Sequence, residues 1–342
     1  MKTDNISKTD FLKNKTVLIT GGTGSFGKNF AKHLLENSDL KKLIIFSRDE
    51  LKQFNMSAEI KDERVRFFLG DIRDLPRLER AFNGVDIVVH AAALKQVPML
   101  EYNPFEAVKT NVLGSQNVID AAIDKKVKKV ILVSSDKAAH PVNLYGSTKL
   151  CAEKLFISGN SYAGQKTRFS CVRYGNVVGS RGSIVDILIN NPNIPTVNIT
   201  HEEMTRFWIG LDQTFKLVLF ALKNMIGGEI FVPKIPSMKL VNLFDCLAPK
   251  AKKVFIGIRP GEKLHEVLLT AEEARHSFEL QGYYVILPEY CEISSVEKKF
   301  KGILSKAKKL PPDFSFMSHT NKNWLTNEEL AKFIEIKKKK HS

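Results

Sequence analysis

Cysteine is scarce in this chain, with four among 342 residues and none in a C-x-x-C pair. The wide separation of Cys151, Cys171, Cys246 and Cys291 argues against a disulfide framework and a zinc site, so we expect small core residues there. No apolar run approaches the roughly 18 residues of a membrane-spanning helix, and the polar start MKTDNISKTD lacks the apolar stretch of a signal peptide. These absences predict a cytoplasmic protein with no membrane partner.

Acidic residues are few relative to basic ones, and the formal net charge is +15. The excess lies in lysine runs such as DKKVKK and KKKK, which are typical of solvated surface. Basic residues interleaved with aromatic ones are lacking, as is a nucleic-acid-reading motif, so we expect no nucleic-acid partner. A nucleotide diphosphate suits such a chain better. A non-catalytic basic nucleic-acid-binding or scaffold protein is the alternative from another class.

Apolar runs alternate with stretches of helical periodicity from residue 16 onward. The runs TVLITG, KLIIFS, VRFFLGD, DIVVHAAA and KKVILVSS are apolar nearly throughout, which predicts a parallel sheet covered by helices on both faces. The expected fold is α/β, a doubly wound, Rossmann-like parallel sheet with a smaller α/β substrate-binding lobe. We expect cofactor binding and catalysis in residues 1–180. Residues 181–342 should form mainly the substrate lobe, with some segments returning to the main sheet.

A glycine-rich loop, GGTGSFGK, follows the first predicted strand and opens the first predicted helix. Glycines at this spacing allow a tight turn and a close approach of backbone N–H groups to a pyrophosphate at the positive end of a helix. In this strand-loop-helix context the motif predicts a dinucleotide site. The residues assigned to it are Gly21, Thr23, Gly24, Ser25, Phe26 and Gly27.

The end of the second predicted strand indicates which dinucleotide is bound. An acid there binds the ribose hydroxyls of NAD, whereas an arginine accommodates the additional phosphate of NADP. The segment FSRDE places Ser47 and Arg48 at this turn, which favours NADP although two acidic residues follow. Further cofactor contacts are expected from Asp49, Lys52, Asp71, Ile72, Ala91 and Lys95.

Tyr145 and Lys149 form a Y-x-x-x-K pattern shortly after the run KKVILVSS. On a helix, residues four apart share one face about 6 Å apart, so we expect the ammonium to lower the pKa of the phenol and to reach a cofactor ribose. A tyrosine with a pKa near neutral can take a proton from a substrate hydroxyl while a nicotinamide takes the hydride. The pattern therefore predicts a redox site that uses both residues as catalytic and cofactor-binding groups.

Asp136 and Lys137 follow the same apolar run directly. In a solvated loop they would be an ordinary ion pair. Ligands bind at the carboxyl ends of parallel strands, however, so an acid and a base at this point predict catalytic groups. No histidine cluster indicates a metal.

With these motifs in place, the first half resembles the extended short-chain dehydrogenase/reductase family of nucleotide-sugar enzymes. Across roughly residues 13 to 332, the segments AAALKQVP, NPFEA, RYGNVVGSRGS, MTRFW, IRPGEKLHE and TNKNWL are similar to soluble UDP-N-acetylglucosamine 4,6-dehydratases that invert C5. Membrane-anchored retaining dehydratases usually carry methionine at the position of Tyr145. The resemblance implies a homo-oligomer that acts on UDP-N-acetylglucosamine in the first step toward pseudaminic acid, used in flagellin glycosylation.

The resemblance also implies how the residues divide the chemistry. Tyr145 would remove the C4 hydroxyl proton while NADP takes the C4 hydride, and Ser135 would hydrogen-bond the C4 oxygen. Lys137 would abstract the C5 proton, and Asp136 would protonate the departing C6 hydroxyl. Hydride return to C6 and reprotonation of C5 from the opposite face would regenerate the cofactor.

A basic role for Lys137 requires a lowered pKa, which we expect from Lys95, Lys149 and a cationic nicotinamide nearby. The implied substrate contacts are Lys95, Tyr145, Asn176, Val177, Arg181, Gly182, Ser183, Ile184, Thr200, Arg206, Arg259, Glu262, Thr320 and Asn321. The rival functions are a nucleotide-sugar 4-epimerase, which has no need of the Asp-Lys pair, and a retaining 4,6-dehydratase.

Overall fold

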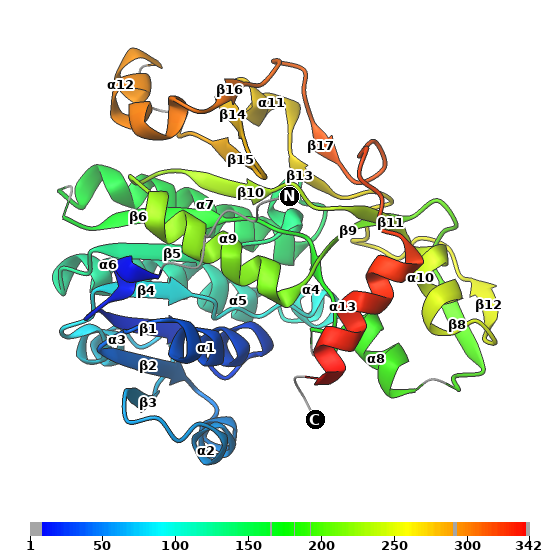
Figure 1. Ribbon diagram of the computed structural model, residues 1–342, viewed down its shortest axis with the longest axis horizontal. Helices are drawn as coiled ribbons and strands as arrows, with labels where there is room; N and C mark the ends of the chain where they lie inside the picture. Colours follow the sequence, from blue (N-terminus) through cyan, green and yellow to red (C-terminus); the bar gives the residue numbers. More distant parts are fainter. Residues whose placement is uncertain (1–8, 165, 181, 192, 290–292, 340–342) are drawn as a thin grey trace.

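The computed structural model describes residues 9–339 except residues 165, 181, 192 and 290–292. A ten-stranded sheet runs through the molecule in the order β16-β14-β15-β10-β6-β5-β4-β1-β2-β3 (Figure 1). The strands from β10 to β3 in this order are parallel, and the remaining three add in antiparallel fashion. Their bounds are β1 Thr16–Thr20, β2 Lys42–Ser47, β3 Val65–Leu69, β4 Ile87–His90, β5 Lys129–Val133, β6 Arg168–Val172, β10 Ile230–Pro233, β14 Ser277–Leu280, β15 Tyr283–Ile286 and β16 Lys308–Lys309. The doubly wound α/β class is confirmed.

Helices cover both faces of this sheet. Helices α1 and α9 pack together on one face, and α3, α6 and α7 pack side by side on the other (Figure 1). The helical segments of this part are η1 Asp10–Leu12, α1 Ser25–Asn37, α2 Glu50–Glu59, α3 Leu75–Phe82, α4 Val97–Tyr102, α5 Pro104–Ala107, η2 Val108–Leu113, α6 Gly114–Asp124, η3 Asp136–Ala138, α7 Leu144–Tyr162 and α9 Leu211–Asn224. Every residue of β1 is buried, as its continuous apolar run predicts. Strand β3 differs because it lies at the sheet edge, where Leu69 is 43% exposed.

The smaller lobe, on the right in Figure 1, contains three short sheets: β11-β9-β7, β12-β8 and β13-β17. Two hydrophobic clusters of its own hold it together. Its strands and the remaining helices are β7 Asn176–Val177, α8 Ile184–Asn190, β8 Thr196–Ile199, β9 Thr205–Ile209, β11 Ser237–Lys239, α10 Leu240–Leu247, β12 Lys252–Phe255, β13 Val267–Leu269, α11 Ala271–Ala274, α12 Ile293–Leu304, β17 Phe316–Met317 and α13 Asn327–Lys339. The chain after residue 180 also supplies β10, β14, β15 and β16 to the main sheet.

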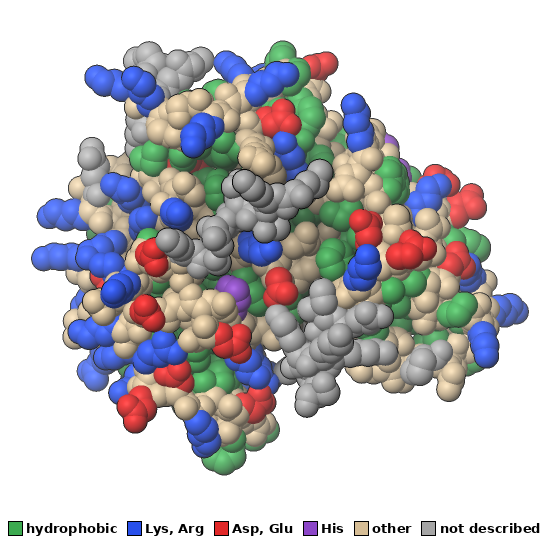
Figure 2. Space-filling view, viewed as in Figure 1, with side chains coloured by type: hydrophobic (Ala, Val, Ile, Leu, Met, Phe, Trp, Pro, Cys, Tyr) green, Lys and Arg blue, Asp and Glu red, His purple; other side chains and the backbone are tan. Residues whose placement is uncertain are grey.

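The structure shows how the charged side chains are distributed over one face and which cysteines are buried. Lysine and arginine side chains project from separate places on the face in Figure 2, with acidic side chains between them. Cys171 is a buried core residue as predicted, but Cys151 is exposed and Cys246 is partly exposed, so the prediction was wrong for those two. Cys291 lies outside the described residues. Within the described part of the chain, no helix combines the length and apolar character needed to cross a membrane.

Arg173, directly after β6, is fully buried and binds two carboxylates, of which Glu153 is 1% exposed and Glu273 20% exposed. Its guanidinium donates to both carboxylate oxygens of Glu153 on α7, at 3.1 and 2.6 Å, and to both of Glu273 on α11, each at 2.9 Å. A further bond of 3.0 Å reaches the carbonyl of Leu268. Burial works against the charge, but the two carboxylates outweigh it and raise the pKa of Arg173. The network joins the end of β6 to α7 and α11.

Replacing Arg173 by methionine is expected to lower the free energy of unfolding by about 3–5 kcal/mol, because the buried Glu153 carboxylate and the partly buried Glu273 carboxylate lose their cation. Denaturant unfolding followed by circular dichroism measures the loss. The control is Lys32→Met, which breaks an exposed pair with Glu59 and is expected to change stability little. Equal, small losses in the two variants would contradict the assignment.

Candidate active site

The glycine loop is shaped by contacts that exclude any side chain. Gly21 has a φ of +65°, and a Cβ there would lie 2.8 Å from the Cα and N of Ala92. A Cβ at Gly27 would lie 2.6 Å from the Gly21 carbonyl oxygen and the Gly22 Cα. The loop therefore packs against both the end of β4 and the first turn of α1. This brings backbone N–H groups to the start of a helix, which fits a dinucleotide pyrophosphate.

The end of β2 presents Arg48, which lies 3.7 Å from the Asp71 carboxylate and has a side chain that is 51% exposed. Burial raises the pKa of Asp71, but hydrogen bonds from Arg73 and the charges of Arg73 and Arg48 lower it overall. Asp49 caps α2 by accepting a hydrogen bond from the Lys52 backbone N–H and also pairs with the Lys52 ammonium. These groups form a polar end of the loop site, with Arg48 on its exposed side.

A cavity of about 450 Å³ begins at the glycine loop and continues between the main sheet and the smaller lobe. It contains most of the residues that the sequence singled out around the reacting centre. Those that line it are Gly21, Gly24, Ser25, Phe26, Gly27, Ala91, Lys95, Ser135, Asp136, Lys137, Tyr145, Lys149, Asn176, Val177, Ser183 and Ile184. Burial lowers the pKa of Lys95 in this cavity.

Helix α7 aims Tyr145 and Lys149 into the cavity. The side chain of Asn143 caps the helix by accepting a 2.8 Å hydrogen bond from the Gly146 N–H. Lys149 is buried, and its ammonium donates to the Val133 carbonyl at the end of β5, at 2.8 Å. Burial lowers the pKa of Lys149 to about 8, against the opposing charge of Glu153 one turn further along α7.

The short η3 turn lies against the first turn of α7. A Cβ on Gly146 would lie 2.3 Å from the Lys137 carbonyl oxygen, so only glycine permits this approach. Ser135 caps η3 by accepting a 3.3 Å bond from the Lys137 N–H and donates to Asp136 Oδ1 at 2.9 Å. The turn therefore places Asp136 and Lys137 in the cavity that Tyr145 also lines.

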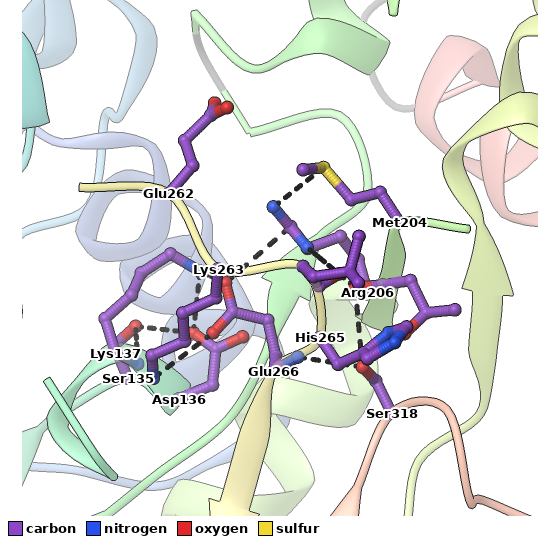
Figure 3. Close-up of polar contacts among 12 residues, drawn as sticks. Ser135, Asp136, Lys137, Met204, Arg206, Glu262, Lys263, His265, Glu266 and Ser318 are labelled. Atoms are coloured by element: carbon purple, nitrogen blue, oxygen red, sulfur yellow. Dashed lines mark hydrogen bonds and ion pairs between the residues drawn. The ribbon is translucent and has the colours of Figure 1, made fainter. Parts of the chain in front are cut away.

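Lys137 lies between two buried carboxylates (Figure 3). Its Nζ donates to Asp136 Oδ1 at 3.0 Å and to Glu266 Oε1 at 2.9 Å, and these carboxylates are 1% and 2% exposed. Burial raises the pKa of Asp136 despite the adjacent ammonium, and the charge of Glu266 adds to the increase. The proton between Lys137 and Asp136 can therefore reside on either group, because the two lie 3.0 Å apart.

Two expected pKa shifts were wrong for the unliganded protein. Burial alone would lower the pKa of Lys137, but Asp136 and Glu266 outweigh it and raise the value. Burial raises the pKa of Tyr145, with smaller opposing contributions from Lys137 and a hydrogen bond with Ser135. The sequence did not reveal that a second carboxylate meets Lys137, nor that burial of the Tyr145 phenol outweighs the nearby ammonium.

Several predicted substrate contacts lie away from the cavity. Arg206 is buried and donates to the carbonyls of Thr205 and Leu264 at 2.7 and 3.2 Å. Arg259 and Glu262 pair with each other on a loop, and Figure 3 shows Glu262 apart from the lysine cluster.

Other predicted cofactor and substrate contacts also lie outside the cavity lining. Asn321 donates to the Ile235 carbonyl at 2.9 Å, and the Gly182 N–H donates to Asp186 Oδ2 at 3.0 Å. The residues not lining the cavity are Thr23, Ser47, Arg48, Asp49, Lys52, Asp71, Ile72, Gly182, Thr200, Arg206, Arg259, Glu262, Thr320 and Asn321. Arg181 lies outside the described residues.

Sequence reasoning missed Glu266 and Trp208. Glu266 precedes the short apolar strand β13, a position that gives no sign of the lysine it meets 129 residues away in sequence. Trp208 lines the cavity, and its buried indole Nε1 has no hydrogen-bond partner within the part of the chain described. That donor can be satisfied by a ligand, because buried polar groups rarely stay unpaired.

Two relatives show high identity over nearly the whole chain. A Campylobacter jejuni protein named UDP-N-acetylglucosamine 4,6-dehydratase (inverting) is 50% identical over 328 residues, covering 94% of this chain and 97% of that protein. A Rickettsia akari protein named UDP-glucose 4-epimerase is 40% identical, covering 94% of this chain and 95% of that protein.

Solved structures agree on the fold. Pen from Bacillus thuringiensis is 38% identical with a TM-score of 0.86, covering 96% of this chain and 99% of that one. The dTDP-glucose 4,6-dehydratase DesIV from Streptomyces venezuelae, solved with NAD and TYD bound, is 23% identical with a TM-score of 0.66, covering 73% and 86%. At that identity, DesIV supports the fold alone.

A family model described as "Polysaccharide biosynthesis protein" matches residues 17–288, which is most of the chain. The matched segment contains the glycine loop, η3, the Tyr145–Lys149 pair and Glu266. The chain therefore belongs to the polysaccharide biosynthesis protein family, whose members here share the extended short-chain dehydrogenase/reductase fold.

Proposed function

We propose that this protein is a UDP-N-acetylglucosamine 4,6-dehydratase that inverts C5 and uses NADP. The product would be UDP-2-acetamido-2,6-dideoxy-β-L-arabino-hex-4-ulose. The observation that carries the proposal is the meeting of two sets of groups in one cavity: Tyr145 with Lys149, and Asp136 with Lys137. The 50% identity to the Campylobacter jejuni protein supports the same function.

The glycine loop and the polar groups at the end of β2 would hold the cofactor. When bound, NADP would supply the hydride acceptor for oxidation at C4 and the hydride donor for reduction at C6. Arg48 supports NADP over NAD because an exposed guanidinium at this turn can pair with the additional phosphate. Asp49 and Lys52 pair with each other, whereas Arg48 has only a longer contact of 3.7 Å with Asp71 and a side chain that is 51% exposed.

Tyr145 would take the C4 hydroxyl proton. Its raised pKa in the free protein keeps the phenol neutral, while the Lys137 charge and the Ser135 hydrogen bond favour ionisation. Lys149, which is held by the Val133 carbonyl, would orient the ribose and contribute positive charge. Positive charge near the phenol would lower the pKa of Tyr145 toward neutral pH.

Asp136 and Lys137 would carry out the elimination. Transfer of one proton from Lys137 Nζ to Asp136 Oδ1, across 3.0 Å, creates a free amine and a neutral carboxylic acid with no change in net charge. The amine would abstract the C5 proton that the C4 ketone makes acidic, and the acid would protonate the leaving C6 hydroxyl. The raised pKa of Asp136 favours this transfer, whereas the raised pKa of the Lys137 ammonium opposes it.

Sugar and nucleotide contacts divide between two regions. Asn176, Val177, Ser183 and Ile184 line the cavity and would surround the sugar. Arg259 and Glu262 are bonded to each other and would separate to bind diphosphate and ribose. The burial of Arg206 favours a supporting role for that residue over a direct one with substrate.

We also propose cytoplasmic placement, a role in pseudaminic acid synthesis for flagellin glycosylation, and a homo-oligomer. The oligomer is supported by apolar side chains exposed on neighbouring segments: Met99 is 62% exposed, Tyr102 86% and Phe105 62%. Such a cluster is typical of a surface that a protein partner covers.

The reaction is tested by incubating the protein with NADP and UDP-N-acetylglucosamine and recording proton NMR spectra. We expect a C6 methyl signal with inverted C5, and deuterium at C5 when the solvent is deuterated. A galacto product would indicate the epimerase, and a methyl product with retained C5 would indicate the retaining dehydratase. Either result would contradict the proposal, as would salt-sensitive RNA binding without sugar turnover.

Replacing Lys137 by alanine is expected to reduce turnover at least about 100-fold, because the elimination loses its base. NMR of the methyl product measures it. The matched control is Lys128→Ala, which removes an exposed lysine that pairs with Asp86 and should leave turnover unchanged. Normal turnover in the Lys137 variant would remove this residue from the mechanism.

Replacing Arg48 by alanine is expected to weaken NADP binding about tenfold and leave NAD binding nearly unchanged, because one exposed charge-assisted contact is lost. Calorimetric titration with each dinucleotide measures the ratio. Arg66→Ala, on the neighbouring strand β3, serves as the control. If NADP and NAD affinities fell equally, Arg48 would not select the phosphate.

A further inference from the structure

Glu266 lies where the smaller lobe meets the catalytic turn, and no predicted role includes it. Its carboxylate is 2% exposed and accepts from Lys137 Nζ at 2.9 Å. The Arg206 Nε lies 3.6 Å from one carboxylate oxygen, and the Lys263 Nζ lies 3.6 Å from the other (Figure 3). One buried anion thus faces three cations that come from η3, β9 and the loop before β13.

The surrounding backbone fixes this carboxylate. The Glu266 N–H donates to Ser318 Oγ at 2.9 Å, and the Ser318 N–H donates to the Glu266 carbonyl at 2.9 Å. Lys263 donates to the Ala139 carbonyl at 2.6 Å, next to η3. The anion is therefore held at a defined distance from Lys137, which a flexible surface carboxylate would not achieve.

We propose that Glu266 is a positioning residue that orients Lys137 and, through its charge, sets how many protons the Asp136–Lys137 pair carries. The inference rests on the proposed function, in which that pair supplies the base and the acid of the elimination. It adds a group that touches neither substrate nor cofactor. Arg206 and Lys263 keep Glu266 ionised, and this is the supporting role we assign to Arg206.

The direction of the effect follows from the charges around the pair. Asp136 on η3, Glu266 and Lys263 before β13, Arg206 on β9 and Tyr145 on α7 are the charged or titratable groups that act on Lys137 or its partners. The Glu266 anion raises the pKa of both Asp136 and Lys137. Burial opposes the charge of Glu266, but Lys137, Arg206 and Lys263 lower its pKa to about 2.

Activity requires the state in which the pair holds one transferable proton. A second proton on Asp136 ends this state at low pH, and loss of the proton from Lys137 ends it at high pH. Because the charge of Glu266 raises the pKa of both Asp136 and Lys137, removing this charge lowers the pH at which activity is lost on the acidic side and on the basic side. The whole pH–rate curve should then move to lower pH, whereas mere loss of structure would lower the rate without moving the curve.

The variant Glu266→Gln removes the charge and keeps the shape. We expect its curve of methyl-product turnover against pH to move down by at least about one pH unit. Glu266→Asp keeps the charge at a shorter reach, and we expect slower turnover with the curve at the wild-type position. Circular dichroism and UDP affinity check that each variant is folded.

A curve for Glu266→Gln that stays at the wild-type position, with methyl product still formed, overturns this inference and leaves the proposed function intact. Absence of methyl product from the wild-type protein overturns the proposed function. In that case NMR titration of ¹³Cε-labelled lysine, assigned with Lys137→Arg, decides the role of Glu266 independently of turnover. We expect Lys137 to titrate at lower pH in Glu266→Gln than in the wild type, and equal titration would refute the inference.

Discussion

Burial of charge is the constraint on which this structure depends. An ammonium, guanidinium or carboxylate that leaves water must meet an opposite charge or a dense set of hydrogen bonds, or it loses its charge. Arg173 meets this demand with two carboxylates, and Lys137 meets it with Asp136 and Glu266. Lys149 meets it only in part, through a carbonyl, and its pKa is lowered accordingly. The same requirement thus determines the charges around Arg173 and those around Lys137.

The main sheet and the position of the two candidate catalytic pairs, Tyr145 with Lys149 and Asp136 with Lys137, could be predicted from the sequence, because both depend on local patterns. Continuous apolar runs specify strands covered on two faces, and a glycine loop between strand and helix specifies a close backbone approach. The four-residue spacing of Tyr145 and Lys149 places them on one face of α7 wherever that helix packs. Asp136 and Lys137 reach the cavity because only two residues separate η3 from the end of β5.

The electrostatic state of the site could not be predicted, because it depends on residues distant in sequence. Glu266 comes from a segment whose short strand pairs with β17 rather than with the main sheet, and no local pattern brings it to Lys137. The expected lowering of the Lys137 pKa rested on Lys95, Lys149 and a cationic nicotinamide, and it omitted this anion. The resemblance implied that Arg206 contacts the substrate, yet β9 directs it into the protein interior.

The return of the chain to the main sheet has a consequence for how the protein can be divided. Strand β6 ends before residue 180, and its second neighbour, β10, comes from the later half of the chain. A fragment cut between the lobes would keep the glycine loop and both candidate catalytic pairs but would expose the unpaired backbone of an apolar strand. Such an open edge invites association with other strands, so the cofactor-binding half is expected to be insoluble without the residues that follow it.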